Sequence, residues 1–187
     1  MEMKKTPTIK GVFVNSHIQR LRKERGKSAV KELEERYGKS VKFSDTEDVP
    51  VKEEVKILEA IIDILEGPPV SLSKRSFEAG KLHFQNFSTT TFAKILFASI
   101  PKTPAGFEKL LLNSEYIVNN VFKNTNFESQ KSEDGTLTVT MGNNDYPIEH
   151  FHGLFSEWLN FWGLKDGKVE AKELEGNRYE YTFLYKK

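Results

Sequence analysis

The chain contains no cysteine among its 187 residues. Disulfides, thiolate nucleophiles and cysteine-ligated zinc sites are therefore excluded. No apolar run approaches the ~18–20 residues that a membrane-spanning helix requires. The N-terminal stretch MEMKKTPTIKG also lacks the apolar core of a signal peptide. These absences predict a cytoplasmic protein with no integral membrane segment.

Catalytic and phosphate-binding motifs are absent as well. No serine stands in a nucleophile-elbow sequence, and no glycine-rich loop is placed to bind a phosphate. The net charge of +1 provides no overall attraction to nucleic acid. We therefore predict a protein that is not an enzyme, does not bind nucleic acid, and carries neither a cofactor nor a metal ion.

Charge is unevenly distributed in the first third of the chain. The segment from Met1 to Lys27 has a net charge of +6, and the segment from Ser28 to Glu66 has a net charge of −5. Two such segments can neutralise each other as solvated faces, which is the ordinary explanation. The alternative is a partner-binding surface, whose basic residues would be Arg20, Arg22, Lys23 and Arg25.

The rest of the chain is organised around one predicted helix, from Pro147 to Gly163. Proline is tolerated at a first helical position, and glycine favours the left-handed conformation that ends a helix. The apolar residues recur at helical spacing and form one continuous stripe: Ile148, Phe151, Phe155, Trp158, Leu159 and Trp162. We expect this helix to cover a four-stranded sheet.

Strand-like segments flank that helix on both sides. Residues 126–131 and 136–141 lie on either side of Asp134-Gly135, a strong hairpin signal, and residues 168–174 and 178–185 form a second pair. The preceding chain shows helical periodicity, with helices expected over 16–26, 28–38, 50–65, 73–87, 92–100 and beyond Pro104. A short strand is expected over 40–43. The pattern predicts an α+β fold: a helical N-terminal half, then a β-β-α-β-β antiparallel sheet with helices packed on one face.

The chain is short enough to form a single domain over residues 1–187. We divide it into an N-terminal helical part (1–67), central helices (68–124) and the β-β-α-β-β part (125–187). Gly67-Pro68-Pro69 is the clearest internal boundary. It separates either an N-terminal arm from the main body or two halves of one domain. Gly80 lies inside a predicted helix, so we expect another backbone to approach it closely.

Four segments of the helical half together resemble an uncharacterised paralogous family best known from myxobacteria: GVFVNSHIQRLRKERG, LEERYGKSVKF, VPVKEEVKILEAIIDIL and SFEAGKLHFQNFSTTTFAKILFASIPKTP. The β-β-α-β-β part is similar in element order to a superfamily that contains vinyl-reductase-like domains, heme-nitric-oxide-binding domains and TRAPP tethering subunits. This resemblance implies binding of a small apolar ligand or heme, or a role as a dimeric scaffold. The chain lacks the cysteine cluster of the first group and the Tyr-x-Ser-x-Arg motif of the second.

The histidines are candidate ligands, each with a structural alternative. His150 and His152 are two apart, so on a helix they point in different directions and cannot share one metal. We expect His152 near the buried stripe and His150 on a second face. His83 is either a heme ligand or, more ordinarily, a histidine at the edge of the core. His17 is expected to be structural, and Glu53 and Glu54 are expected to be helix-surface carboxylates.

Aromatic residues are numerous, with 14 Phe, 6 Tyr and 2 Trp. Most of them must form core, but a helix-on-sheet layer this rich in rings can also enclose an apolar pocket. The residues that would line such a pocket are Phe77, Phe84, Phe92, Phe151, Phe155 and Trp158.

Two functional hypotheses follow from these patterns. The first is a regulatory or scaffold module that acts through protein–protein contacts. The alternative is a sensor domain that binds a small apolar ligand or heme in the pocket between helices and sheet. A homodimer is also predicted, because the long helix carries apolar residues on a second side (Leu154 and Phe161) and because residues 107–118 are rich in apolar side chains.

Overall fold

The computed structural model describes residues 5–68, 71–176 and 178–186. Within them the chain forms helices and strands in the following order: β1 (Thr8–Lys10), α1 (Gly11–Tyr37), β2 (Asp48–Pro50), α2 (Val51–Glu66), α3 (Leu72–Thr89), α4 (Thr91–Ala98), α5 (Pro104–Leu112), α6 (Ser114–Val121), β3 (Phe122–Lys123), β4 (Asn126–Lys131), β5 (Leu137–Gly142), α7 (Ile148–Phe161), β6 (Lys168–Leu174) and β7 (Arg178–Leu184). The predicted α+β fold is therefore confirmed. Pro69 and Asn177 lie outside the described residues.

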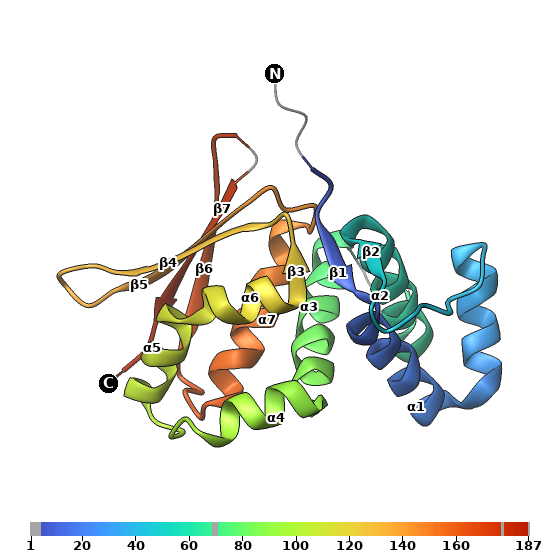
Figure 1. Cartoon of the computed structure of the whole chain (residues 1–187), viewed down its shortest axis with the longest axis horizontal. Helices are drawn as coiled ribbons and strands as arrows, with labels where there is room; N and C mark the ends of the chain where they lie inside the picture. Colours follow the sequence, from blue (N-terminus) through green and yellow to red (C-terminus); the bar gives the residue numbers. More distant parts are fainter. Residues whose placement is uncertain (1–4, 69–70, 177, 187) are drawn as a thin grey trace.

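The C-terminal part has the predicted β-β-α-β-β order. Its four antiparallel strands are arranged β4-β5-β7-β6, and α7 lies across one face of the sheet (Figure 1). Tyr181 on β7 is fully buried, and its ring lies 5.1 Å from the ring of Phe155 on α7. The alternation of apolar and polar residues in β5 decides which side chains face α7, because successive side chains of a strand point to opposite faces.

The N-terminal part corrects three predictions. The segment GVFV was expected to be extended, but α1 already begins at Gly11. Gly26 breaks this helix with a positive φ of 82°, so the predicted division into two helical pieces is right while the predicted start at Ser16 is wrong. The strand expected over 40–43 is absent from the described structure there. Instead, β1 pairs with β2 and β3 in a small sheet that was not predicted.

Helices α3 and α7 pack against each other through two glycines. A Cβ atom on Gly80 would lie 1.7 Å from the carbonyl oxygen of His150. A Cβ atom on Gly153 would lie 2.0 Å from the carbonyl oxygen of Phe77. The close backbone approach predicted at Gly80 is confirmed. Helix α3 thereby lies between α7 and the α1–α2 pair (Figure 1), and this places it at the centre of the molecule.

The apolar surfaces behind the dimer prediction are buried within the chain. Leu154 is 9% exposed, and Phe161 packs its ring against Phe84 and Phe97. On α5 and α6, Phe107, Leu110, Leu111, Ile117 and Val118 are likewise buried in the core, whereas Leu112 is 38% and Tyr116 is 65% exposed. The second side of α7 packs against α3 and α4 within the chain, so it does not support a dimer contact, and the homodimer stays a prediction. In the described part of the chain, no helix is long and apolar enough to cross a membrane.

Candidate functional site

An apolar pocket lies between α3, α6 and α7. Its volume is about 60 Å³. The residues that line it come from these helices and from the start of β3 and β4: His83, Phe84, Phe87, Ser114, Ile117, Val118, Val121, Phe122, Phe127, Phe151, Leu154, Phe155 and Trp158. The helix-on-sheet packing of large rings therefore leaves a small internal space.

Four of the six aromatic residues predicted to line a pocket do so, namely Phe84, Phe151, Phe155 and Trp158. Phe77 and Phe92 do not line it. Phe77 packs its ring edge-on against His152, 5.1 Å away on the outer side of the α3–α7 contact, and Phe92 contacts Phe87 from α4. Helix α6 forms one wall of the pocket, through Ile117 and Val118 among others. The sequence did not identify this wall, because these two residues were assigned to the predicted homodimer contact.

Trp158 stands out among the lining residues. It is 6% exposed, and within the described residues its indole N–H has no hydrogen-bond partner. The other tryptophan, Trp162, donates its indole N–H to the carbonyl oxygen of Pro101 at 3.3 Å. Buried indole N–H groups normally find an acceptor. Trp158, one of the residues that line the pocket, therefore carries a buried N–H group that has no acceptor among the described residues.

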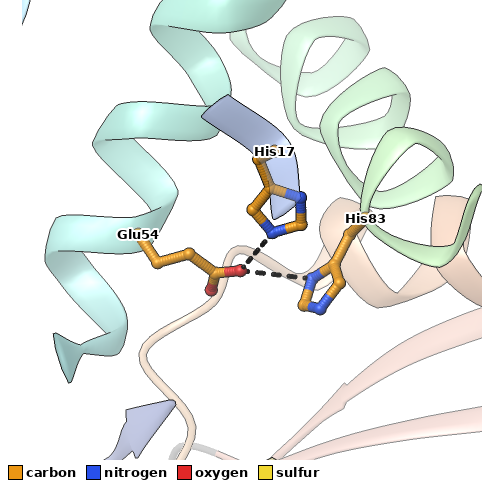
Figure 2. Close-up of side chains that lie close together, drawn as sticks. All are labelled: His17, Glu54 and His83. Atoms are coloured by element: carbon orange, nitrogen blue, oxygen red, sulfur yellow. Dashed lines mark hydrogen bonds and ion pairs between the residues drawn. The ribbon is translucent and has the colours of Figure 1, made fainter. Parts of the chain in front are cut away.

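A cluster of buried polar side chains lies on the other side of α3. Figure 2 shows His17 from α1 and His83 from α3 turned toward the same carboxylate oxygen of Glu54, which comes from α2. His17 Nε2 lies 3.1 Å from Glu54 Oε1, and His83 Nδ1 lies 3.5 Å from the same oxygen. All three residues are at most 2% exposed. Three separate helices thus converge on one carboxylate.

Further polar groups surround this cluster. The hydroxyl of Tyr146 donates to Glu54 Oε2, and His150 Nε2 lies 3.1 Å from His83 Nδ1. Asn86 Nδ2 lies 2.8 Å from His17 Nδ1, and Arg20 reaches Asn86 Oδ1 at 3.4 Å. Each imidazole of the cluster is thereby held in one orientation.

Burial controls the protonation of the cluster. Removal from water lowers the pKa of His17 to about 3, with Arg20 contributing, and lowers the pKa of His83 to about 4. Burial likewise holds the pKa of His150 well below its ordinary value and raises the pKa of Glu54. The three histidines are therefore neutral at pH 7, and their nitrogens remain available as hydrogen-bond acceptors or metal ligands.

Several sequence-based expectations fail at this cluster. Glu54 was assigned to the helix surface but is fully buried, and His150 is buried while His152 is half-exposed and bound to Glu149. One sequence signal was present: Glu54 lies three residues after Val51 and four before Leu58, within the buried stripe of α2. A carboxylate in such a stripe indicates a buried partner.

The four basic residues predicted as a partner surface differ in their contacts within the chain. Arg20 binds Glu24, Gln85 and Asn86, and it therefore ties α1 to α3. Arg25 donates to the carbonyl oxygen of Leu65 at 2.8 Å, at the end of α2. Arg22 and Lys23 are exposed. Two of the four thus have structural roles.

Comparison with known proteins places the chain in a family and a fold. The family model described as "Protein of unknown function (DUF2378)" matches residues 3–183. No curated protein matches the sequence. Among solved structures, an H-NOX protein from S. oneidensis in the Fe(II)NO ligation state is 12% identical with a TM-score of 0.69, covering 96% of this chain and 100% of its own.

Two further solved structures have the same fold. A structure described as "Modulating Heme Redox Potential Through Protein-Induced Porphyrin Distortion" is 17% identical with a TM-score of 0.67, covering 95% of this chain and all of its own. Another, described as "Structural insights into the molecular mechanism of H-NOX activation", is 17% identical with a TM-score of 0.66. The match covers 96% of this chain and 97% of that protein's chain. At these identities the likeness establishes the H-NOX-like fold, and function has to be argued from the site.

Proposed function

The chain belongs to the DUF2378 family of proteins of unknown function, and we propose that it is a sensor domain whose apolar pocket binds a small apolar molecule. The observation that carries this proposal is the pocket itself, enclosed by α3, α6 and α7 in a domain with the fold of H-NOX proteins. Both the fold and the pocket support the sensor hypothesis better than the scaffold hypothesis.

The volume of the pocket limits the size of the ligand. An engineered cavity of about 150 Å³ holds a benzene molecule, so a cavity of about 60 Å³ suits a diatomic gas, a xenon atom or a molecule of about four heavy atoms. The best small ligands gain at most about 1.5 kcal/mol per heavy atom, which limits such a ligand to a dissociation constant of tens of micromolar.

The unused donor of Trp158 suggests what else the ligand carries. A buried N–H without a partner is destabilising, and a ligand with one acceptor atom would satisfy it. We therefore propose a small apolar molecule as the ligand, and within that class we expect tighter binding of one whose single acceptor atom can reach the Trp158 N–H.

A heme does not fit the residues present in this pocket. The space is several times smaller than the roughly 300–1,000 Å³ of typical cofactor and drug sites. Its described lining contains no lysine or arginine that could pair with propionates. The single histidine in the lining, His83, directs its Nδ1 toward Glu54 and His150. We therefore assign no heme-dependent step to this chain.

The proposal can be tested with xenon and with a pair of ligands of nearly the same shape. We expect ¹²⁹Xe NMR to detect exchange of xenon with the wild-type protein, and we expect Val118→Phe, which fills the pocket, to remove that signal. Acetone and isobutene differ mainly in one acceptor oxygen, so wild type should bind acetone more tightly. Trp158→Phe should remove that preference while preserving xenon binding.

Trp162→Phe is the matched control, because Trp162 is the other tryptophan and its N–H already has an acceptor. This variant should keep the preference for acetone. Absence of a xenon response in folded wild type, or a response that Val118→Phe leaves unchanged, would overturn the proposed function.

A further inference from the structure

We infer that His17, Glu54 and His83 form a binding site for a divalent first-row transition-metal ion. The site lies on the opposite side of α3 from most of the apolar pocket and shares only His83 with its lining. The inference is therefore independent of the sensor proposal, and either could fail without the other.

The spacing of the three ligand atoms suits a single ion. Metal–ligand bonds to imidazole nitrogen and carboxylate oxygen are about 2.0–2.2 Å long, which places two neighbouring ligands about 2.9–3.5 Å apart. The observed separations from Glu54 Oε1 are 3.1 Å to His17 Nε2 and 3.5 Å to His83 Nδ1. All three atoms lie within 4.8 Å of one another. A small rotation of either imidazole would complete the triangle.

The charge of the cluster also favours a cation. Glu54 is fully buried, and within the described part of the chain its carboxylate contacts the neutral side chains of His17, His83 and Tyr146, with no lysine or arginine among them. Buried charges in proteins are normally paired or coordinate a metal. The nearest basic side chain, Arg20, reaches the cluster only through Asn86. A divalent ion would neutralise the carboxylate directly.

The ligand set indicates the class of metal. Two imidazoles and one carboxylate form a mixed nitrogen and oxygen set, which suits zinc or ferrous iron better than magnesium or calcium. Three protein ligands leave at least one coordination position open. His150 Nε2, 3.1 Å from His83 Nδ1, is placed to approach that position or to bind a water molecule on the metal.

The groups around the triad supply part of the support that metal-binding residues need. Such a histidine donates its other N–H to a neighbouring acceptor, and its carboxylate co-ligand is itself hydrogen-bonded. Tyr146 already donates to Glu54 Oε2. Without a metal, the Asn86 side-chain N–H donates to His17 Nδ1. When His17 binds a metal through Nε2, its proton moves to Nδ1. The Asn86 amide must then turn, so that its oxygen accepts from the Nδ1–H.

The test uses the full-length chain and Co²⁺, because Co²⁺ absorbs visible light when imidazole and carboxylate bind it. The ligands are buried, so the protein is first stripped of metal with a chelator in mild denaturant and then refolded with Co²⁺, Zn²⁺ or Fe²⁺. We expect one ion per chain by mass spectrometry of the metal, a visible Co²⁺ spectrum, and a higher thermal midpoint with each ion.

Variants then locate the ion. Glu54→Gln and His83→Gln preserve side-chain size, and each should weaken Co²⁺ binding by at least 100-fold. Asn86→Ala should weaken it by 10- to 100-fold, as expected for a group that orients a ligand. His152→Gln is the matched control, since His152 also pairs with a carboxylate, Glu149, at 3.2 Å on the half-exposed side of α7. This control should bind Co²⁺ as wild type does.

Three outcomes would overturn the inference. The first is a wild-type chain that refolds without taking up any of the three ions. The second is Co²⁺ binding that survives Glu54→Gln and His83→Gln in folded protein. The third is binding that His152→Gln abolishes. If the cluster variants do not fold, X-ray absorption of the Co²⁺ wild type decides, because a first shell without two imidazoles contradicts the site.

Discussion

Helix α3 separates two buried regions of opposite character. On one side, His17, Glu54 and His83 form a cluster in which nearly every polar atom faces another polar atom. On the other side, rings from α3 and α7 surround an apolar space of about 60 Å³. His83 borders both regions. Both are formed by buried side chains, yet one is filled by directed contacts and the other leaves room.

The difference follows from how each kind of group tolerates burial. A buried polar atom without a partner loses its hydrogen bonds to water and is strongly destabilising. An apolar wall that faces a void loses only some dispersion contacts. The cluster therefore has to be complete, whereas the pocket can remain partly empty and accept a ligand. The following predictions test this contrast, from the largest expected effect to the smallest.

Removal of the central carboxylate should have the largest effect. Glu54→Ala leaves His17, His83 and Tyr146 without their shared acceptor, so the free energy of unfolding should fall by about 3–5 kcal/mol. Urea denaturation measures this loss. Glu66→Ala on the same helix is the control, because Glu66 is exposed at the end of α2, and its effect should stay below about 1 kcal/mol. Equal losses in the two variants would contradict the contrast.

Enlargement of the pocket should destabilise almost as much, but a ligand should reverse the loss. Phe155→Ala removes a ring between α7 and the sheet, and we expect a loss of about 3–4 kcal/mol. The enlarged cavity should then admit benzene, which would raise the thermal midpoint of the variant and leave wild type unchanged. Stabilisation of both proteins by benzene would show that the native pocket is larger than described.

Acid should weaken the cluster side alone. The folded pKa values of His17 and His83, about 3 and about 4, lie below the ordinary 6.5, so the unfolded chain binds more protons as the pH falls below 6.5. The stability of metal-free protein should therefore decline from about pH 6.5 down to pH 4. The lowered pKa of His150 adds to this decline and protonation of Glu54, whose pKa is raised, opposes it, and we expect a net loss of stability.

Chemical denaturation at several pH values measures this decline. Xenon occupancy of the pocket should stay constant over the same range as long as the chain remains folded, because the lining is almost entirely apolar. Stability that stays flat between pH 6.5 and 4 would contradict the neutral histidines assigned to the cluster.

The smallest effect is expected from the loss of one hydroxyl. Tyr146→Phe removes the donor to Glu54 Oε2 and preserves the ring that stacks on His150, at 4.4 Å between centroids. A loss of about 1–2 kcal/mol is expected in urea denaturation. Tyr116→Phe is the control, since Tyr116 is 65% exposed and should show no measurable change. A Tyr146→Phe variant as stable as wild type would mean that the cluster does not depend on this contact.

The sequence alone predicted the C-terminal part closely. The strand pairs flanking α7 agree with the structure to within one residue at almost every boundary. Period-2 alternation and the Asp134-Gly135 turn are local signals, so they can be recognised without knowledge of the rest of the fold. Four of the pocket residues were also predicted from the sequence, because large rings at helical spacing on α3 and α7 must meet between those helices.

The N-terminal part was predicted less well because its order depends on distant partners. β1 is only three residues long and exists because β2 and β3 lie beside it. The start of α1 at Gly11 depends on the contact of its N–H with the carbonyl oxygen of Glu47, at 2.8 Å. Neither partner can be recognised from the neighbouring sequence.

By itself, then, the sequence determined the helix Ile148–Phe161, the sheet beneath it and the apolar faces that meet there, because periodicity and turn residues act over a few positions. Only the tertiary structure brought Glu54 together with His17 and Tyr146, which are 37 and 92 positions away from it along the chain. The sequence around a single polar residue in an otherwise apolar stripe does not indicate which distant residue it will contact. Their pairing is decided when packing of the helices removes them from water and leaves each one with only the others to bind.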